Sequence, residues 1–381
     1  MKKYDVIILG CGASGAMCAL SAKSKNIAII DNFLKPTKKI LVTGNGRCNI
    51  TNANMNSSFF NQNINSFLSR FSQKDALNFF EKLGLVCYAD NEGRVYPISN
   101  SAKSVMDTIN LSLNKKAELF LEHKVLNVVA RNNKFVVETD KDIFECEKLV
   151  VATGGNSEIL KCFDVCKKDF IPSLVALKSN DIKDLNGVKI SNVKVTAKNS
   201  QGNSKSEVGE VLFKDGGLSG ICVFNLSSLF SRINDFSGEI EIDLLPNMDY
   251  QQILDILEKR KHMFLKMTDF FTGLFLPSVA NEIFRQAKTN INIKPDALTN
   301  EHISKLAKTI KCLKFNICGF FENNQVFSGG VCLEGLTNNL MSKKIKNLYF
   351  CGEICDVDGI CGGYNLQWAW TSGHIVGESL W

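Results

Sequence analysis

The sequence predicts an α/β fold, in which a domain built on a parallel sheet is interrupted by a β-barrel-like and helical insertion. Near the N-terminus, apolar runs over Tyr4–Leu9 and Asn26–Ile30 flank a glycine-rich turn and a helical segment, as in a βαβ unit. A strand over Leu348–Gly352 and a helix over Asn365–Leu380 resume this pattern at the C-terminus. The two ends of the chain are therefore expected to build one domain together.

Helix signals follow the first βαβ unit. Ser72 is placed to cap a helix, because Asp75 stands three residues later and apolar side chains then recur at helical spacing. Gly84 occupies the expected C-cap of that helix. We expect a further helix over Ser101–Asn114.

Short runs rich in Val, Phe and Ile occupy the next part of the chain, from Ala117 to Ala152. The expected strands are Leu119–Val129, Lys134–Thr139, Asp142–Cys146 and Lys148–Ala152. We predict a parallel strand, then a β-meander, and then a return to the main sheet.

The middle of the chain mixes strands with helices. Val188–Phe224 is β-rich and punctuated by glycine, and Glu239–Leu244 alternates like a strand. Tyr250–Ile310 is largely helical, and in Asn300–Ile310 the apolar residues fall at i, i+3, i+4 and i+7.

Length and composition fit two or three domains. With 381 residues, of which 45% are hydrophobic and 22% charged, the chain is an ordinary globular protein with enough material for a large core. We divide it into a discontinuous domain, residues 1–155 and 331–381, and an inserted substrate or cap domain, residues 156–330.

Charge and hydropathy bear on partners and location. The net charge of +6 is spread along the chain, which is too diffuse to favour a nucleic acid partner. Met1-Lys2-Lys3 and the apolar residues after them superficially resemble a signal peptide, but Asp5 and three glycines interrupt that pattern. No apolar run approaches the roughly 20 residues that a membrane span needs. We expect a cytoplasmic protein without a membrane partner; the oligomeric state stays open.

The fourteen cysteines do not form a recognisable scaffold, because no two of them have C-x-x-C spacing. The groupings Cys162/Cys166 and Cys351/Cys355/Cys361 match neither common ferredoxin pattern. We expect reduced and mostly buried thiols, and no metal site.

A Gly-x-Gly-x-x-Gly turn lies between the first strand and the first helix, the context that a dinucleotide site requires. Gly10 permits the tight turn, Gly12 lets the backbone approach a pyrophosphate, and Gly15 lets helix and strand pack closely. The backbone amides of Ala13 and Ser14 lie at the N-terminus of the helix, where they can interact with the phosphate charge. Asp31 ends the second strand, where it can accept hydrogen bonds from ribose hydroxyls.

A second glycine loop follows Lys38-Lys39-Ile40. Its flexible amides and its single cation suggest contacts to pyrophosphate or flavin, although an ordinary surface loop with a solvated Arg47 would have the same composition. The candidate residues are Lys39, Thr43, Gly44, Gly46, Arg47, Cys48 and Asn49.

A third segment, near the C-terminus, carries a strand that ends in Gly352-Glu353 and a glycine pair that opens a helix. Such a pair aims amide dipoles at the group in front of it, in flavoproteins the pyrimidine end of the isoalloxazine. Asp356 and Asp358 could equally be solvated turn residues. The candidate residues are Gly352, Glu353, Asp356, Gly362, Gly363, Tyr364, Asn365 and Leu366.

These three pieces, in this order, resemble the bacterial flavoproteins described as aminoacetone-oxidase-like or BaiN-type FAD-dependent oxidoreductases. The motifs that carry the resemblance are Lys39–Asn52, Gly93–Pro97, Ala152–Gly155, Gly217–Gly220 and Gly352–Gln367. The resemblance implies a Rossmann-type FAD-binding domain with bound FAD and an inserted middle domain over the flavin. We add Val125, Ala152, Thr153 and Gly154 to the expected cofactor contacts.

Two positions depart from that family. Lys214-Asp215-Gly216 stands where the family usually has Thr-His before Gly-Leu-Ser-Gly, and Ile221 replaces the following proline. Val326-Phe327-Ser328 stands where the family reads Val-Thr-x before Gly-Gly-Val. These changes argue against transferring a family substrate to this chain.

The reaction expected is two-electron transfer through the flavin between a small organic substrate and either oxygen or NAD(P)H. Because only one dinucleotide fingerprint is present, a nicotinamide would dock transiently. No catalytic side chain is identified, since none of the four histidines lies in an acid-base constellation; Tyr364 and Arg47 are the polar groups expected nearest the flavin. The alternatives are a flavin-dependent tRNA-modifying or RNA-binding protein, and a regulatory flavoprotein without turnover.

Overall fold

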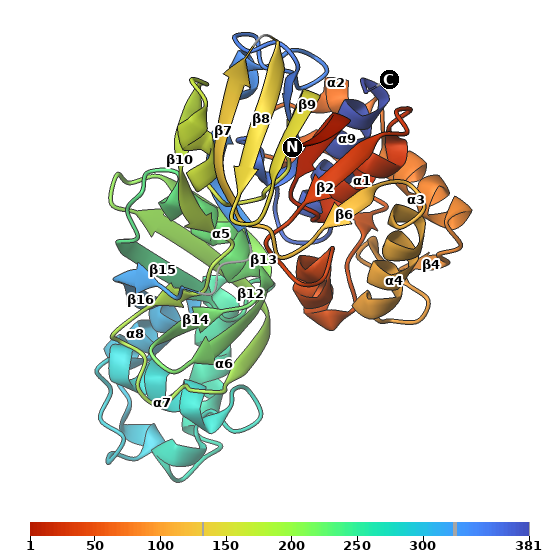
Figure 1. Cartoon of the computed structure of the whole chain (residues 1–381). Coiled ribbons are helices and arrows are strands. Elements are labelled where there is room, and N and C mark those ends of the chain that lie inside the picture. Colours follow the sequence, from red (N-terminus) through yellow and green to blue (C-terminus); the bar gives the residue numbers. More distant parts are fainter. Residues whose placement is uncertain (132, 323–325, 381) are drawn as a thin grey trace. The chain divides into compact units, whose positions relative to one another are not determined.

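The computed structural model describes residues 1–131, 133–322 and 326–380 (Figure 1). The chain divides into two compact units: unit 1 comprises Met1–Ile171 and Val326–Trp381, and unit 2 comprises Pro172–Gln325. The domain ranges expected from the sequence include residues 132, 323–325 and 381, which lie outside the described residues.

Unit 1 is built on a seven-stranded sheet with the order β6-β2-β1-β9-β8-β7, in which β19 pairs with β9. Its strands are β1 (Lys2–Leu9), β2 (Ile27–Ile30), β6 (Glu118–Phe120), β7 (Val125–Arg131), β8 (Lys134–Thr139), β9 (Ile143–Val151) and β19 (Leu348–Phe350). The strands β6, β2, β1, β9 and β19 run parallel, whereas β7, β8 and β9 form an antiparallel meander. The predicted Rossmann-type α/β fold is confirmed.

The meander differs from the prediction at two places. The run expected as one strand over Leu119–Val129 is divided into β6 and β7 by a turn in which Glu122 adopts a φ of 56°. The two runs expected around Glu147 instead form one continuous strand, β9. The first half of β9 pairs with β8 and the second half with β19, so one strand serves the meander and the parallel sheet.

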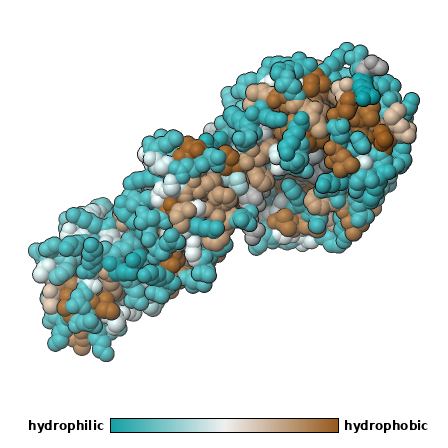
Figure 2. Space-filling model, turned by 60° about the vertical axis from the view of Figure 1, so that its left-hand side comes forward, coloured by the Kyte–Doolittle hydropathy of each residue, from teal (hydrophilic) through white to brown (hydrophobic). Residues whose placement is uncertain are grey.

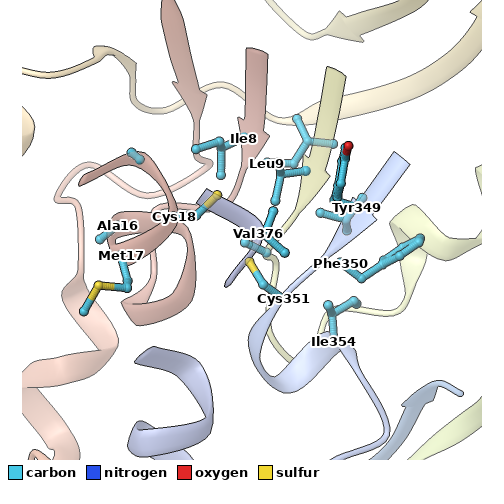
Figure 3. Close-up of a cluster of buried hydrophobic side chains, with 14 of the residues drawn as sticks. Ile8, Leu9, Ala16, Met17, Cys18, Tyr349, Phe350, Cys351, Ile354 and Val376 are labelled. Atoms are coloured by element: carbon cyan, nitrogen blue, oxygen red, sulfur yellow. The ribbon is translucent and has the colours of Figure 1, made fainter. Parts of the chain in front are cut away.

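The first and last helices of the chain pack against each other in unit 1. These are α1 (Ala13–Ser21) and α9 (Tyr364–Glu378). A Cβ added to Gly373 would lie 2.4 Å from the carbonyl oxygen of Ser14, and one added to Gly377 would lie 2.5 Å from that of Cys18. The two glycines of α9 therefore allow this close approach. Figure 3 shows the core that results, with side chains from β1, α1, β19 and α9: Ile8, Leu9, Met17, Cys18, Phe350, Cys351 and Val376.

Smaller elements complete unit 1. They are η1 (Lys38–Gly46), β3 (Thr51–Asn52), η2 (Ser57–Phe59), α2 (Asn65–Leu68), α3 (Gln73–Lys82), β4 (Cys87–Ala89), β5 (Arg94–Pro97), α4 (Ala102–Leu113), η3 (Glu158–Cys162), η6 (Leu333–Gly335) and η7 (Gly352–Ile354). The helix expected after Ser72 is α3, and Ser72 and Asp75 form its capping box. Strands β3, β5 and β4 form a small antiparallel sheet.

A two-stranded sheet carries the chain out of unit 1 and back. Its strands are β10 (Lys167–Ser173) and β18 (Val326–Val331). The N–H of Cys332 donates to the carbonyl of Cys166, and a Cβ on Gly329 would meet the carbonyl of Asp169, so the strands run antiparallel. Because β10 as far as Ile171 and all of β18 belong to unit 1, unit 2 begins later and ends earlier than residues 156 and 330.

Unit 2 is built on one antiparallel sheet with the order β16-β15-β12-β13-β14-β11-β17. Its elements are β11 (Leu177–Lys178), β12 (Lys189–Asn199), β13 (Ser204–Lys214), β14 (Gly217–Ser219), α5 (Ile221–Ser231), β15 (Gly238–Asp243), α6 (Tyr250–Lys261), η4 (Met267–Asp269), α7 (Pro277–Gln286), η5 (Pro295–Ala297), α8 (Asn300–Lys311), β16 (Leu313–Ile317) and β17 (Gly319–Phe320).

The β-rich segment expected up to Phe224 ends earlier, because α5 begins at Ile221. Its residues Cys222, Val223 and Leu226 are all buried, and a helix buried on most sides has the continuous apolar pattern of a buried strand.

Surface hydropathy and helix length bear on membrane contact. On the face drawn in Figure 2, hydrophobic residues form separate patches among hydrophilic ones. None of the helices in the described part of the chain is both long and apolar enough to cross a bilayer.

Candidate flavin site

The glycine turn has the geometry that its motif predicts. Gly10 adopts a φ of +99°, and a Cβ there would lie 2.5 Å from the carbonyl oxygen of Ala152. A Cβ on Gly15 would lie 2.0 Å from the carbonyl oxygen of Gly10, so helix α1 packs directly on the turn. Gly12, the N-cap of α1, has open space around the same position. The turn is therefore tightly packed on its inner side and open at Gly12, where a ligand can approach the amides of the helix.

Asp31 is fixed by backbone donors on both sides. Its Oδ2 accepts from the N–H of Cys11 at 2.5 Å, and its Oδ1 accepts from the N–H of Phe33 at 2.8 Å. The carbonyl of Asp31 accepts from the N–H of His123, two residues before Val125. This bond holds the segment that leads from β6 into β7 at the end of β2.

The C-terminal segment meets the glycine turn through Ser14. The Ser14 hydroxyl donates to the carbonyl of Cys351 at 3.2 Å, and a Cβ on Gly352 would lie 2.3 Å from Ser14 Oγ. The indole N–H of Trp368 donates to the carbonyl of Gly352 at 3.0 Å. Two motifs separated by more than 300 residues in the sequence are thus in contact.

Glu353 lies at a junction of three motifs. Its Oε2 is 3.9 Å from Nζ of Lys39, and a Cβ on Gly154 would lie 3.1 Å from Oε2 and 3.4 Å from Nζ. Its Oε1 accepts from the N–H of Phe327 at 2.9 Å, which orients the carboxylate. The ring of Phe327 lies where a side chain on Gly155 would be. Phe327, which departs from the family pattern, therefore contacts both Glu353 and Gly155.

The loop after Lys39 is held in a left-handed conformation. Gly44, Asn45, Gly46 and Cys48 all have φ between 55° and 78°. A Cβ on Gly44 would lie 2.4 Å from the backbone nitrogen of Asn49, so only glycine fits there. Burial raises the pKa of the Cys48 thiol to about 12, which keeps this thiol protonated at neutral pH.

Two polar groups of this loop face different surroundings. The guanidinium of Arg47 lies 4.1 Å from the ring centroid of Tyr96, so the cation is stacked on an aromatic face. The Oδ1 of Asn49 is buried and has no hydrogen-bond partner among the described residues. A buried acceptor of this kind calls for a partner, because leaving it unsatisfied costs about 1–3 kcal/mol.

The glycine pair before α9 packs on β3. A Cβ on Gly363 would lie 2.4 Å from the carbonyl oxygen of Thr51, and the Asn52 amide donates to the carbonyl of Gly362 at 3.0 Å. The side chain of Asn365 accepts from the N–H of Gly359 and donates to its carbonyl, each at 2.8 Å. The loop between Gly359 and α9 is therefore closed by Asn365.

Tyr364 begins α9, and its ring packs edge-on against two phenylalanines. The ring centroids are 5.2 Å from Phe59 and 5.8 Å from Phe60. Burial raises the pKa of Tyr364 above its usual value, so the phenol stays neutral. Leu366 is half-buried in the first turn of the same helix.

Asp356 is not a solvated turn residue. Asp356 and Asp358 are each only 3% exposed, so the solvated interpretation is wrong for both. The Asp356 carboxylate accepts from Nζ of Lys168 at 2.7 Å and from the Asn61 amide at 3.2 Å. The Gln62 amide donates to the Asp356 carbonyl. The carboxylate is thus held by β10 and by the segment before α2.

Most of the predicted residues fall into two groups. The glycine turn, Thr153 and Gly154 after β9, Lys39, Gly352 and Glu353 form one group. The glycine loop and the start of α9 meet around β3 and β5 and form the other. The sequence interpretation assigned no role to these supporting residues: Asn52, Asn61, Tyr96, Lys168 and Phe327. Asn52 and Tyr96 stood within motifs that carry the family resemblance, and Phe327 stood at a position that departs from it; Asn61 and Lys168 had no local signal.

The sequence matches the family described as HI0933-like protein Rossmann domain over residues 4–379. It is 29% identical over 402 residues to a 3-dehydro-bile acid delta(4,6)-reductase of Clostridium scindens, covering 98% of each chain. It is 30% identical over 413 residues to a ribosomal RNA dihydrouridine synthase of Escherichia coli, covering 100% of this chain and 98% of the relative. Among solved structures, an open flavocytochrome c3 fumarate reductase superimposes with a TM-score of 0.44 at 14% identity, over 99% of this chain and 78% of the other.

Proposed function

This chain belongs to the family of HI0933-like proteins with a Rossmann domain, and from that premise we propose that it is an FAD-dependent reductase. The bacterial oxidoreductase family that the motifs resemble is the same family, with a bile acid reductase among its members. The observation that carries the proposal is the contact between the open glycine turn and the Gly352-Glu353 segment, joined by Ser14.

The residues present fit FAD. The open space at Gly12 leaves room for a pyrophosphate at the N-terminus of α1, and Asp31 stands beside it at the end of β2. A pyrophosphate and a ribose diol are features of FAD rather than of FMN, which has neither a second phosphate nor an adenosine. The unsatisfied Asn49 Oδ1 supplies an acceptor for a donor group of the cofactor. Bound FAD would supply two-electron chemistry, and the protein would supply its orientation and electrostatics.

The relatives' names suggest a class of substrate. A delta(4,6)-reductase and a dihydrouridine synthase both add hydrogen to carbon-carbon double bonds, and in both substrates the double bond is conjugated to a carbonyl group. We propose that this chain reduces an unsaturated carbonyl compound, with NAD(P)H as a transient donor. When no organic substrate is present, oxygen would accept the electrons from the reduced flavin instead.

A uridine in ribosomal RNA is the second candidate substrate. It is favoured by the relative from Escherichia coli, which is alignable over the whole chain. The charge of unit 2 gives it no further support, because basic and acidic residues nearly balance over residues 172–325, and lysines such as Lys198 and Lys314 pair with Glu241.

The test is a pair of anaerobic half-reactions on the purified protein. The flavin absorbance should bleach on addition of NADH or NADPH, and it should return when a suitable unsaturated carbonyl compound is added. A panel of enones, free uridine and a transcribed fragment of ribosomal RNA separates the two substrates. Recovery with RNA alone selects the second candidate, whereas a purified protein that neither retains nor takes up FAD rules out the whole proposal.

A further inference from the structure

Two cysteines face each other at the base of the β10–β18 sheet. The N–H of Cys332 donates to the carbonyl of Cys166 at 2.9 Å. A Cβ on Gly329 would lie 2.0 Å from the carbonyl oxygen of Asp169. Gly329 is three residues before Cys332 and Asp169 is three residues after Cys166, so both contacts fit one antiparallel register. Residues opposed in this way have Cα atoms about 4.5–5.5 Å apart, within the roughly 4.4–6.8 Å that disulfides span.

The two side chains are in contact but differ in exposure. The Cys166 side chain is a hydrogen-bond partner of the Cys332 thiol. Cys166 is exposed, whereas Cys332 is 5% exposed. Burial raises the pKa of Cys332 to about 12, so Cys166 is the thiol that meets an oxidant first.

We propose that Cys166 and Cys332 are a site of reversible oxidation, which forms a disulfide when the protein meets a hydroperoxide. The Cys166 thiolate attacks the peroxide, an S–O bond forms, the O–O bond breaks, and the departing oxygen takes up a proton to leave as water or an alcohol. The Cys332 sulfur then attacks the Cys166 sulfur, the S–S bond forms, and the S–O bond breaks with loss of water. The two thiols lose two electrons and two protons in total, and an added thiol reverses the step.

A second pair provides a contrast. Cys18 and Cys351 also interact with each other, but both are fully buried in the core drawn in Figure 3. Burial and the neighbouring Cys351 hold the pKa of Cys18 far above its usual value. Proximity is common to the two pairs, whereas access to solvent distinguishes Cys166. Oxidation should therefore be confined to the pair on β10 and β18.

The position of the pair gives the bond a specific effect. The chain segment between Cys166 and Cys332 contains the whole of unit 2. A disulfide would close this segment into a loop and join the two parts of unit 1 covalently. Beside the pair, Lys168 of β10 bonds to Asp356, and the Asp356 N–H donates to the carbonyl of Val331 on β18. Oxidation would thus link β10 and β18 covalently, and these are the two strands that contact Asp356.

The experiment uses the FAD-loaded full chain with a specific protease site inserted in the exposed segment around Met263 and Leu265. The protein is treated with hydrogen peroxide, blocked, cleaved and run on a denaturing gel with and without reductant. We expect the two fragments to stay joined without reductant and to separate with it. Peptide mapping should find one linked pair, Cys166 with Cys332, with the mass of two hydrogen atoms missing.

Matched variants make the result specific. Cys166→Ser and Cys332→Ser should each abolish the joined band, and in Cys332→Ser the oxidised Cys166 should be trapped as a sulfenic acid by dimedone. Cys318, the other exposed cysteine, donates to the carbonyl of Lys178 and should give only singly oxidised products. Separate fragments from oxidised wild-type protein, or a linked pair at other cysteines, would overturn the proposal. These outcomes do not depend on turnover, so they stand apart from the test of the proposed function.

Discussion

The backbone N–H of Cys11 donates to the carboxylate of Asp31 at 2.5 Å, and this bond links the glycine turn after β1 to the end of β2. The N–H of Thr37 also donates to the carbonyl of Cys11, so the chain that leaves β2 returns to the same turn. The motif predicts that Asp31 binds a ribose, and the structure shows that its carboxylate holds the glycine turn and the segment after β2 together. The predicted ribose contact is compatible with these backbone contacts, because one carboxylate oxygen can accept more than one hydrogen bond.

The first prediction separates these two functions of Asp31. Asp31→Ala should lower the free energy of unfolding by about 2 kcal/mol even without cofactor, because two backbone N–H groups lose a charged acceptor. Asp31→Asn should lose about half as much stability, since its single oxygen can accept from only one of the two N–H groups, and it should weaken FAD binding. Urea unfolding of apo and FAD-loaded protein measures both. Equal stability of the apo forms of wild type and Asp31→Ala would contradict the structural part.

The second prediction concerns two glycines of the turn, Gly12 and Gly15. Gly12→Leu should fold normally but fail to retain FAD, because its Cβ meets no protein atom and its side chain would fill the space left for the pyrophosphate. Gly15→Ala is the contrasting variant, since its Cβ would lie 2.0 Å from the carbonyl of Gly10 and should prevent folding. Circular dichroism and flavin absorbance distinguish the two failures. Retention of FAD by Gly12→Leu would mean that the cofactor is placed elsewhere.

The third prediction tests the unsatisfied acceptor of Asn49. If Oδ1 awaits a cofactor group, Asn49→Leu should leave the apo protein as stable as wild type or more so, because it removes an unpaired buried polar atom. The same variant should bind FAD roughly tenfold more weakly, the equivalent of one hydrogen bond of about 1.4 kcal/mol. Titration of apo protein with FAD gives the affinity. Unchanged affinity would show that Asn49 does not contact the cofactor.

The fourth prediction is a double-mutant cycle on Lys168 and Asp356. Lys168→Met should destabilise unit 1 by roughly 1–3 kcal/mol, because it leaves the buried Asp356 carboxylate without its cation. In an Asp356→Asn background the same change should cost much less, since no buried charge remains. Denaturant unfolding of the four proteins gives the interaction energy. Additive effects would show that the pair does not contribute as a unit.

The fifth prediction is a pH dependence in unit 2. Burial alone would raise the pKa of Glu241, but hydrogen bonds from Lys198 and Lys314 outweigh it and lower the pKa from 4.5 to about 2. The folded state therefore holds the proton less tightly than the unfolded state. The resulting stability is present above pH 4.5 and is lost as the pH falls toward 2. Glu241→Gln should flatten the loss of stability with falling pH over that range. An unchanged slope would exclude Glu241 as its source.

The elements that could be predicted from the sequence are those in which residues close in sequence are also close in space. The first βαβ unit, the Ser72 capping box and the helix over Asn300–Lys311 each depend on contacts within a few residues. A one-dimensional pattern is ambiguous where burial is uniform, which is why the start of α5 at Ile221 resembled a strand. The division of one expected strand at Glu122 depends on a single left-handed residue.

The candidate site was predictable as a set of motifs but not as a set of contacts. Gly12, Asp31 and Glu353 could be selected because their motifs fix their roles. The burial of Asp356 could not, because it depends on Lys168 and Asn61, which are 188 and 295 residues away. The β10–β18 sheet was not predicted for the same reason, since its short strands have no periodic pattern and pair with each other across the whole insertion. The expected boundaries at residues 155 and 331 followed from that omission.

The packing of α1 against α9 also sets an order of events during synthesis on the ribosome. Ser14 and Cys18 emerge early, but their packing partners Gly373 and Gly377 are made only after the whole of unit 2. Unit 2 is continuous in sequence and is complete before β19 and α9 appear. The half-made chain must therefore carry an exposed N-terminal βαβ unit through most of translation, in a state that chaperones can bind. The glycine turn can reach its final packing only after α9 has been made.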